Sequence, residues 1–312
     1  MKSLVTGLAA AAALTLAAVV PAAAQQNSRI IVVSHGQAND PFWSVVKNGV
    51  TAAGQDMKVQ VDYRAPETFD MVAMAQLIDA AVNQKPAGLI VSIPDASALT
   101  PSIQKAVAAG IPVISMNAGS DVSKKLGALL HVGQDEFDAG KAAGARLKEL
   151  GGKASLCVNH EVGNVSLDQR CKGFAEGFGG KVTTVPVSTD PADVRAKVKA
   201  ALSSDASVDT IMALGPLSSE PAIAAAKEAG KGGAVKIASF DLSASLLKSI
   251  AAGDAVFAID QQQYLQGYLP VVFLALHAKY GLIPGGDVPS GPNLITKDKA
   301  AQVVDLSSKG IR

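Results

Sequence analysis

Short apolar runs alternate with segments of helical spacing along almost the whole chain, and this alternation limits the fold more than any other feature. The first run, Ile30 to Val33, is apolar and β-branched, as expected for a strand buried on both faces. Thr68 to Asn83 carries apolar residues at helical spacing. Strands that alternate with helices predict parallel sheets flanked by helices. Further strands are expected at 59–61, 88–92, 112–115, 128–132, 154–158, 182–186, 210–214, 235–239 and 256–259, and further helices at 99–109, 136–150, 167–178, 191–203, 220–229, 242–252 and 264–280.

The alternating pattern begins a second time near Ala154, after the helix stop at Gly151-Gly152. The two halves share the order of their elements but show no sequence repeat. Setting aside the first 24 of 312 residues leaves 288, which favours two domains of roughly 100–200 residues each. An apolar content of 48% is enough for a core in each. We therefore expect two doubly wound α/β domains.

The first 24 residues have the composition of a secretory signal peptide. Lys2 provides a positive start, residues 4–20 are rich in Ala, Leu and Val, and Ala22 to Ala24 form a small-residue cleavage site. An uncleaved membrane anchor is the alternative, but the apolar run is interrupted and falls short of roughly 20 strongly apolar residues. Gln25 follows the cleavage site, so no lipid-bearing Cys is present there. The sequence predicts export to the periplasm.

The charge balance argues against polyanionic partners. The chain has 28 basic and 27 acidic residues, and removal of the signal segment takes away only Lys2, which leaves 27 of each. A net charge near zero without basic runs disfavours nucleic acid and anionic membranes. No second apolar segment approaches the length of a membrane span.

The chain has two cysteines, Cys157 and Cys171. In an exported chain such a pair suggests a disulfide between the end of one strand and the helix that follows it. Two buried reduced thiols remain the alternative. Two cysteines exclude a Cys-based metal cluster, and the four histidines are too scattered to indicate a metal site, so we expect no metal.

Motifs for cofactor binding and covalent catalysis are absent from the sequence. The first strand is not followed by a Gly-x-Gly-x-x-Gly loop, and no Gly-x-Ser-x-Gly elbow is present. Asp40, Asp95 and Asp241 could pair in space as the two carboxylates of a glycosidase. The sequence does not give their separations, so it indicates a glycosidase only weakly. We therefore expect no cofactor and no enzymatic activity.

Polar and aromatic residues collect in the loops that follow the strands, where open α/β sheets bind ligands. After the first strand, Asp40 and Pro41 form a helix start, and the rings of Phe42 and Trp43 follow at once. The alternative is that these rings only fasten the helix to the sheet. In the ligand-binding interpretation, replacing Trp43 by Ala weakens binding and leaves the unfolding of the empty protein nearly unchanged. Later loops offer Asp95, Asn117, Asn159, Asn164, Asp241 and Gln261.

For three of these residues, Asp95, Asn159 and Asn164, the prediction rests on loop position alone. Each of them could instead cap the helix that follows. The two interpretations stay open at this point.

With these features in place, the chain resembles the periplasmic sugar-binding proteins of ABC importers, of the ribose-binding type. The resemblance covers almost all of residues 28–312 and is most specific at 39–43, 109–114, 240–241 and 258–267. It implies a type I periplasmic binding protein: two doubly wound parallel-sheet domains joined by a three-crossing hinge, with the ligand cleft between them. The implied domains are an N-terminal lobe, 28–133 plus 262–289, and a C-terminal lobe, 134–261 plus 290–312, with crossings near Gln134, Gln261 and Pro289-Ser290.

The resemblance also carries the family's ligand positions onto particular residues. Phe42 and Trp43 match its stacking aromatics, Asp40 holds the place of an Asn, and Asp241 and Gln261 match directly. Arg170 matches a binding arginine, Asn117-Ala118 replaces an Asp-Arg pair, and Gly215 stands where the family has an Asn.

A sugar or polyol presents hydroxyls that both donate and accept, and Asp, Asn, Gln and Arg side chains satisfy them with directional bonds. The resemblance therefore implies a monomeric receptor that captures a monosaccharide or sugar alcohol by hinge closure and delivers it to a membrane ABC permease. Two alternatives remain: a sensor module for a chemoreceptor or kinase, and an exported carbohydrate-active enzyme. Sugar-responsive repressors share the implied fold, but this chain has a signal segment in place of a DNA-binding headpiece.

Overall fold

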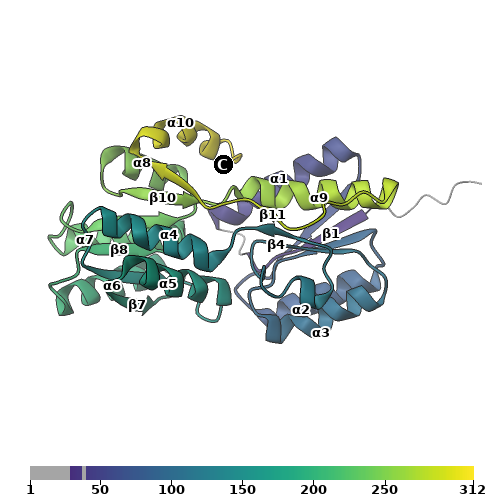
Figure 1. Ribbon diagram of the computed structural model, residues 1–312, viewed down its shortest axis with the longest axis horizontal. Helices are drawn as coiled ribbons and strands as arrows, with labels where there is room; N and C mark the ends of the chain where they lie inside the picture. The colour runs from purple at the N-terminus through teal and green to yellow at the C-terminus, as the bar shows by residue number, and fades with distance from the viewer. Residues whose placement is uncertain (1–28, 37–39) are drawn as a thin grey trace, which may run out of the picture.

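The computed structural model of the chain describes residues 29–36 and 40–312. These residues form two α/β lobes that lie side by side along the long axis of the molecule (Figure 1). The predicted signal peptide, residues 1–24, falls outside the described residues. Within the described ranges, no helix combines the length and the apolar character that crossing a bilayer requires.

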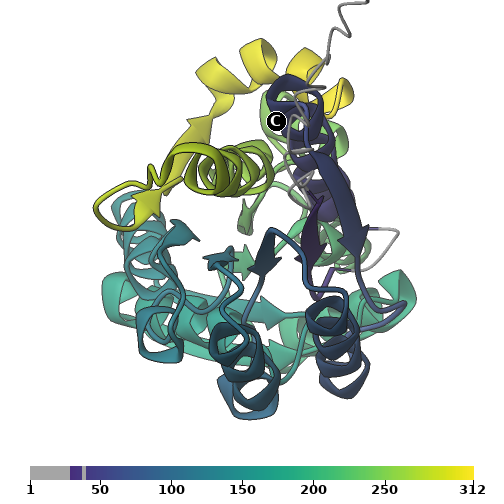
Figure 2. The same ribbon diagram turned by 90° about the vertical axis from the view of Figure 1, so that its right-hand side faces the viewer.

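The N-terminal lobe is built on six parallel strands in the order β11-β5-β4-β3-β1-β2. Two pairs of helices cover its faces, α1 with α9 and α2 with α3, and Figure 2 looks onto this lobe from its outer end. The strands are β1 (Arg29–Val33), β2 (Gln60–Arg64), β3 (Gly88–Val91), β4 (Val113–Met116), β5 (His131–Gly133) and β11 (Val288–Pro289). The helices are α1 (Pro41–Met57), α2 (Met71–Asn83), α3 (Ala96–Ala108), the 3-10 turn η1 (Lys124–Leu126) and α9 (Gln263–Tyr280).

The C-terminal lobe repeats this layout with the strand order β12-β10-β9-β8-β6-β7, in which β12 alone runs antiparallel to its neighbour. Its strands are β6 (Ala154–Asn159), β7 (Lys181–Pro186), β8 (Thr210–Ala213), β9 (Lys236–Phe240), β10 (Phe257–Asp260) and β12 (Asn293–Thr296). Its helices are α4 (Glu136–Glu149) and α5 (Val165–Phe178) on one face, and α6 (Pro191–Ser204), α7 (Pro216–Glu228), α8 (Ala244–Ala252) and α10 (Lys297–Ser308) on the other.

Side chains of a single strand serve both faces of its sheet, which explains the purely apolar runs in the sequence. In β1, Ile30 and Val32 pack in the cluster under α1 and α9, whereas Ile31 and Val33 pack under α2 and α3. Successive strand residues point to opposite faces, so a sheet covered on both sides needs apolar residues at every position. The prediction of two doubly wound α/β domains is confirmed, with one antiparallel edge strand added.

The chain passes between the two sheets three times. The passages lie between β5 and α4 at Gln134–Asp135, between β10 and α9 at Gln261–Gln262, and between β11 and β12 at Ser290–Pro292. They meet at Gly291: a Cβ atom built there would lie 2.8 Å from Gln134 Oε1 and 3.0 Å from Gln261 Cα. All three passages are therefore packed against one another at one point between the lobes.

The last elements of the chain were not expected from the sequence. β11 and β12 contain two and four residues, too few to produce a visible alternation, and α10 follows β12 without a turn. Helix starts also differ from expectation: α3 begins at Ala96 and α7 at Pro216, each earlier in the chain than its predicted start. α3 begins with the small residues Ala96 to Ala98, and α7 begins with Pro216, so apolar spacing becomes visible only later in each helix.

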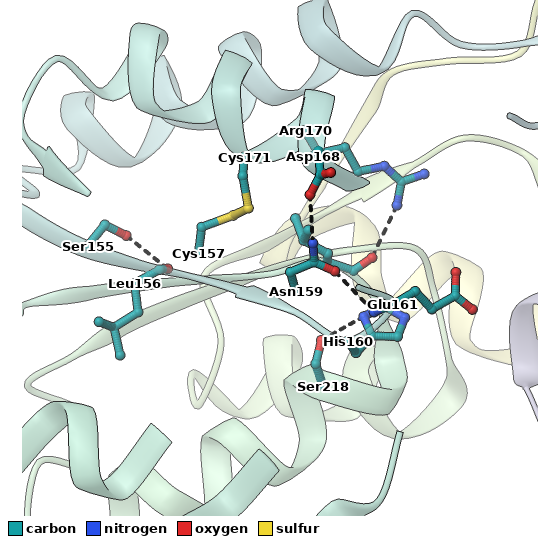
Figure 3. Close-up of a disulfide and its surroundings, with 11 residues drawn as sticks. Ser155, Leu156, Cys157, Asn159, His160, Glu161, Asp168, Arg170, Cys171 and Ser218 are labelled. Atoms are coloured by element: carbon teal, nitrogen blue, oxygen red, sulfur yellow. Dashed lines mark hydrogen bonds between the residues drawn. A yellow bond between two sulfur atoms is a disulfide. The ribbon is translucent and has the colours of Figure 1, made fainter. Parts of the chain in front are cut away.

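The predicted disulfide between Cys157 and Cys171 is present, with a Cα–Cα distance of 5.9 Å (Figure 3). It joins β6 to α5, two residues before β6 ends at Asn159. Both cysteines are buried in the core cluster between the sheet and α4 and α5. The bond therefore holds α5 against the strand whose carboxyl end faces the other lobe.

Candidate ligand-binding site

A cavity lies between the two lobes, at the carboxyl ends of their parallel strands. Ligand sites in open α/β sheets occur at this end, because strands there deliver their following loops to one place. Both lobes and the second passage contribute to the wall. The lining residues are His35, Asp40, Phe42, Trp43, Asn117, His160, Glu161, Asn164, Ser166, Leu167, Arg170, Leu214, Gly215, Pro216, Asp241 and Gln261.

The loop after β1 and the start of α1 form the aromatic wall of the cavity. Asp40 is the N-cap of α1, and its Oδ1 accepts a hydrogen bond of 2.9 Å from the backbone N–H of Phe42. The Trp43 ring meets the rings of Phe42 and His35 edge to face, at centroid distances of 5.1 and 4.7 Å. Phe42 and Trp43 are also members of the core cluster under α1. The two interpretations of these rings are thus compatible, since both rings pack in the core and line the cavity.

Asn117 and Asp241 occupy equivalent positions in the two lobes, directly after β4 and β9. Both have a φ of 63°, a left-handed conformation that Asn and Asp tolerate better than most residues. Gln261 lies near both: its Nε2 donates to Asp241 Oδ1 at 2.6 Å, and its Oε1 accepts from Asn117 Nδ2 at 3.4 Å. The amide of Gln261 therefore links the two loops across the passage between the lobes.

Arg170, on α5, is held by carboxylates on both sides. Its Nε and Nη2 donate to the two oxygens of Glu136 at 2.6 and 2.9 Å, and Asp241 Oδ2 lies 3.6 Å from Nη1. The guanidinium also lies over the Phe240 ring at 4.4 Å and donates to the Leu214 carbonyl at 3.1 Å. Although burial lowers the pKa of Arg170, these neighbouring carboxylates raise it overall. Most of its donors are already bonded to protein.

The two lobes touch directly beside the cavity. Glu161 and Asn164, in the loop after β6, meet His35 of the other lobe: Asn164 Nδ2 lies 3.4 Å and Glu161 Oε2 3.8 Å from His35 Nε2. Asn164 also donates to Glu161 at 2.8 Å and caps α5 by accepting from Ser166 N–H. A backbone hydrogen bond of 3.0 Å from Val165 N–H to the Pro94 carbonyl adds a second contact between the lobes. The structure is thus the closed arrangement of the two lobes.

Burial changes the protonation of the titratable groups in the cavity wall. It raises the pKa of Asp40 to about 7, and it raises that of Asp241 to about 7 despite the lowering effect of Arg170. Burial also raises the pKa of Glu161. For His35 and His160, burial and then the charge of Arg170 lower the pKa, to about 3 and about 4. Both imidazoles are therefore neutral at pH 7.

Eight of the ten predicted binding residues line the cavity: Asp40, Phe42, Trp43, Asn117, Asn164, Arg170, Asp241 and Gln261. The other two do not. Asp95 is the N-cap of α3, where its Oδ1 accepts from Ser97 and Ala98. Asn159 accepts from Glu161 N–H and donates to Asp168, and so shapes the loop after β6 without facing the cavity. For Asp95 the capping alternative describes what is seen, whereas Asn159 shapes a turn and caps no helix.

Eight residues of the wall are not among the predicted binding residues, and three of these eight, His35, His160 and Glu161, have titratable side chains. The histidines form no metal-binding spacing in the sequence, so that pattern gives no reason to place them in a site. A usable signal did exist, since His35 and His160 each follow a strand of their sheet by one or two residues. Most of the predicted binding residues were chosen because they follow a strand, and His35, His160 and Glu161 follow a strand in the same way.

In the part of the chain that the structure describes, no group of three or more His, Cys, Asp or Glu side chains is arranged to hold a metal ion. The wall instead combines aromatic rings with carboxylates, amides and neutral imidazoles. Such a wall suits a small polar molecule that donates several hydrogen bonds and has an apolar face.

Comparison with solved structures places this architecture among transport proteins. A carbohydrate transporter from Acidothermus cellulolyticus, solved in complex with myo-inositol, superposes with a TM-score of 0.87 and 40% identity over 91% of this chain and 99% of that chain. A periplasmic sugar-binding protein of an ABC sugar transporter from Legionella pneumophila gives a TM-score of 0.79 and 26% identity over 84% of this chain and 99% of the other.

Sequence comparison gives the same assignment. The xylose/arabinose-binding protein XylF of Sulfolobus acidocaldarius is 26% identical over 266 residues, which are 80% of this chain and just under two thirds, 66%, of that protein. The family described as periplasmic binding protein domain matches residues 30–282. With its two parallel-sheet lobes, three passages and interlobe cavity, this chain belongs to the periplasmic binding protein domain family and has the type I fold.

Proposed function

We propose that this chain is the periplasmic solute-binding component of an ABC transporter and captures a monosaccharide or sugar alcohol, with myo-inositol as the first candidate. The observation that carries the proposal is the cavity between the lobes, whose wall combines the rings of Phe42 and Trp43 with the side chains of Asp241 and Arg170. Aromatic faces cover the C–H surface of a sugar or cyclitol ring, and carboxylates accept its hydroxyls. The myo-inositol complex of the Acidothermus protein supports this choice of ligand.

The charges in the wall favour an uncharged ligand over an acidic one. Asp40, Glu161 and Asp241 offer carboxyl oxygens to the cavity. Arg170, the one cation among the described residues that line it, is paired with Glu136. A carboxylate or phosphate on the ligand would meet these acceptors without a free positive partner. A polyol hydroxyl, by contrast, donates to a carboxylate at no cost in net charge.

Closure of the lobes supplies both the affinity and the signal to a partner. The contacts of His35 with Glu161 and Asn164 form only when the lobes approach each other. A ligand that is bonded to both lobes shifts the equilibrium toward this form through contacts that the open form lacks. We infer that the permease recognises the closed, loaded monomer in the periplasm, to which the predicted signal peptide directs the chain.

The test is a thermal-shift screen followed by calorimetric titration, with myo-inositol, other cyclitols, pentoses and hexoses. A true ligand raises the melting temperature with its concentration, and an affinity in the micromolar range, about −8 kcal/mol, suits capture and release. The ligand should be recovered unchanged. No stabilisation by any of these compounds would contradict the proposal, and a chemically altered ligand would point to an exported enzyme.

Delivery to a permease is tested by uptake of labelled ligand into the source cells. Deletion of the gene should abolish high-affinity uptake, and the gene on a plasmid should restore it. Normal uptake combined with loss of chemotaxis toward the ligand would instead support a sensor module.

A further inference from the structure

His160 and Gly215 fit together in a way that the site description above does not explain. An ideal Cβ atom at Gly215 would lie 2.9 Å from Cε1 and 3.3 Å from Nε2 of the His160 ring, and 3.9 Å from Asp241 Oδ2. The first of these distances is shorter than real Cβ contacts allow. The imidazole of His160 therefore lies against the bare Cα of Gly215, in space that any other residue at position 215 would need.

The backbone does not account for the glycine. Gly215 has φ 173° and ψ 171°, an extended conformation that every residue type adopts, so no left-handed turn requires glycine here. Gly215 is also the N-cap of α7 and contributes no capping side chain, whereas Asp, Asn or Ser caps α1 to α6 and α8. Room for the His160 ring is the remaining physical reason.

The hydrogen bonds around His160 fix which of its two ring nitrogens carries the proton and which has a lone pair. The hydroxyl of Ser218 donates to the Gly215 carbonyl at 3.0 Å, so its lone pairs are left for His160 Nδ1, 3.4 Å away (Figure 3). Nδ1 is therefore the protonated nitrogen. Among the residues that the structure describes, Nε2 has no hydrogen-bond partner, and the ring lines the cavity.

We propose that His160 is a ligand-contacting, specificity-determining residue. Its ring occupies the space that Gly215 leaves open, and its Nε2 accepts a hydrogen bond from one ligand hydroxyl. The inference rests on the proposed function, because it assigns this contact to a sugar or cyclitol. Burial keeps the ring neutral at pH 7, with a pKa lowered to about 4, so Nε2 is an acceptor only. Together with the nearby Asp241 Oδ2, it selects a ligand with hydroxyl donors on this side and rejects analogues that lack one.

The experiment is calorimetric titration of the mature full chain with myo-inositol in a double-mutant cycle of His160→Ala and Gly215→Ala. Each single variant should weaken binding about tenfold, as expected for one lost hydrogen bond to the ligand. The double variant should bind no more weakly than His160→Ala alone, since the added methyl group harms binding only by displacing the ring. His160→Gln, which keeps an acceptor near Nε2, should recover most of the affinity. His277→Ala, far from the cavity on α9, is the matched control.

Deoxy-inositols separate a ligand contact from a merely structural role of the ring. The wild-type protein should lose about tenfold in affinity for one deoxy isomer, and His160→Ala should bind that isomer and myo-inositol equally. Unchanged affinity in His160→Ala, or costs of the two single substitutions that add up in the double variant, would overturn the inference while leaving the proposed function intact.

A ligand-free measurement keeps the two claims separate. Nitrogen chemical shifts of the His160 ring, from two-bond ¹H–¹⁵N correlation, should report a proton on Nδ1 only, and Gly215→Ala should shift them. A ring protonated on Nε2 would overturn the inference whether or not a ligand is known. A wild-type protein that binds no polyol or sugar would overturn the proposed function, and with it the assigned ligand contact.

Discussion

At the scale of single residues, burial in the cavity wall disfavours the charged form of the carboxyl groups. Asp40 and Asp241 both have pKa values raised to about 7, and burial is the first cause for each. The unfolded chain ionises an Asp near its ordinary value of 3.8. Between these two values the folded protein holds more protons than the unfolded chain, so this contribution to stability is lost as the pH rises from about 4 to about 7.

Asp40→Asn tests this sign. The Asn oxygen can still accept from Phe42 N–H, but the variant never ionises, so it avoids the cost of a buried carboxylate at high pH. The melting temperature of the variant relative to wild type should rise by several degrees between pH 5 and pH 8, which corresponds to a free energy of about 2–3 kcal/mol.

Comparison at each pH also cancels the opposite contribution of the buried histidines, whose lowered pKa values favour the folded state at high pH. Asp79→Asn, at an exposed carboxylate bonded to Lys105, serves as the control. A difference between Asp40→Asn and wild type that stays constant from pH 5 to pH 8 would show that Asp40 does not titrate in this range.

The burial of Trp43 changes what its removal should do. Only 5% of the residue is exposed, and its ring packs in the core cluster beneath α1. Trp43→Ala should therefore weaken polyol binding and also destabilise the empty protein, by about 3–5 kcal/mol. The sequence-based expectation that unfolding would be nearly unchanged does not take this packing into account. Urea unfolding and calorimetry measure the two effects, and Tyr280→Ala, at an exposed ring, is the control.

At the scale of secondary-structure elements, α5 is the best-anchored helix of the site. The disulfide ties it to β6, and it packs so closely on α4 that a Cβ at Gly173 would lie 1.9 Å from the Phe137 carbonyl oxygen. This close approach brings Glu136 of α4 to the guanidinium of Arg170 on α5. The Arg170 guanidinium is thus positioned by the contact between two helices.

Loss of the disulfide should loosen this anchor. The bond closes a loop of 14 residues, for which chain entropy predicts a contribution of about 3 kcal/mol to the free energy of unfolding. Cys157→Ala/Cys171→Ala should be less stable by about 2–4 kcal/mol in urea unfolding and should bind polyol more weakly, since Cys171 adjoins Arg170. The reduced wild-type protein should behave in the same way. Equal stability of oxidised and reduced protein would contradict this role.

At the scale of the whole molecule, opening and closing depend on three chain passages that meet at Gly291. Its missing side chain lets Gln134 and Gln261 approach from the other two passages. Every rotation of one lobe against the other must change this contact, because the three passages are the covalent connections between the two sheets.

Gly291→Ala should therefore bias the lobes away from the closed form. A Cβ there would lie 2.8 Å from Gln134 Oε1 and 3.1 Å from the Asp260 carbonyl oxygen, so the Gln134 side chain must shift and the second passage must move by a few tenths of an ångström. We expect affinity for the polyol to fall about tenfold, and small-angle X-ray scattering to show a smaller ligand-induced compaction than in wild type. Gly286→Ala, at a site with open space around it, is the matched control. Equal affinity and compaction in both variants would argue against a shared pivot at Gly291.

The sequence by itself determined the fold class, because its signals are local. Purely apolar runs such as Ile30–Val33 require sheets covered on both faces, and residues placed just after strands, such as Asp241, reach the ligand edge of any parallel sheet. The same rule misplaced Asp95 and Asn159, because a short polar side chain satisfies a helix N-cap or a turn as readily as a ligand.

Only the tertiary structure decided which of these loops meet. His35 and Glu161 are far apart in the chain and lie 3.8 Å apart across the cavity, and the Arg170–Glu136 pair depends on how two helices pack. Likewise, the space that His160 takes from Gly215 appears in no local pattern, since one ring fills a position that another segment leaves empty. Such relations depend on long-range packing, which fixes distances between segments that the order of residues leaves free.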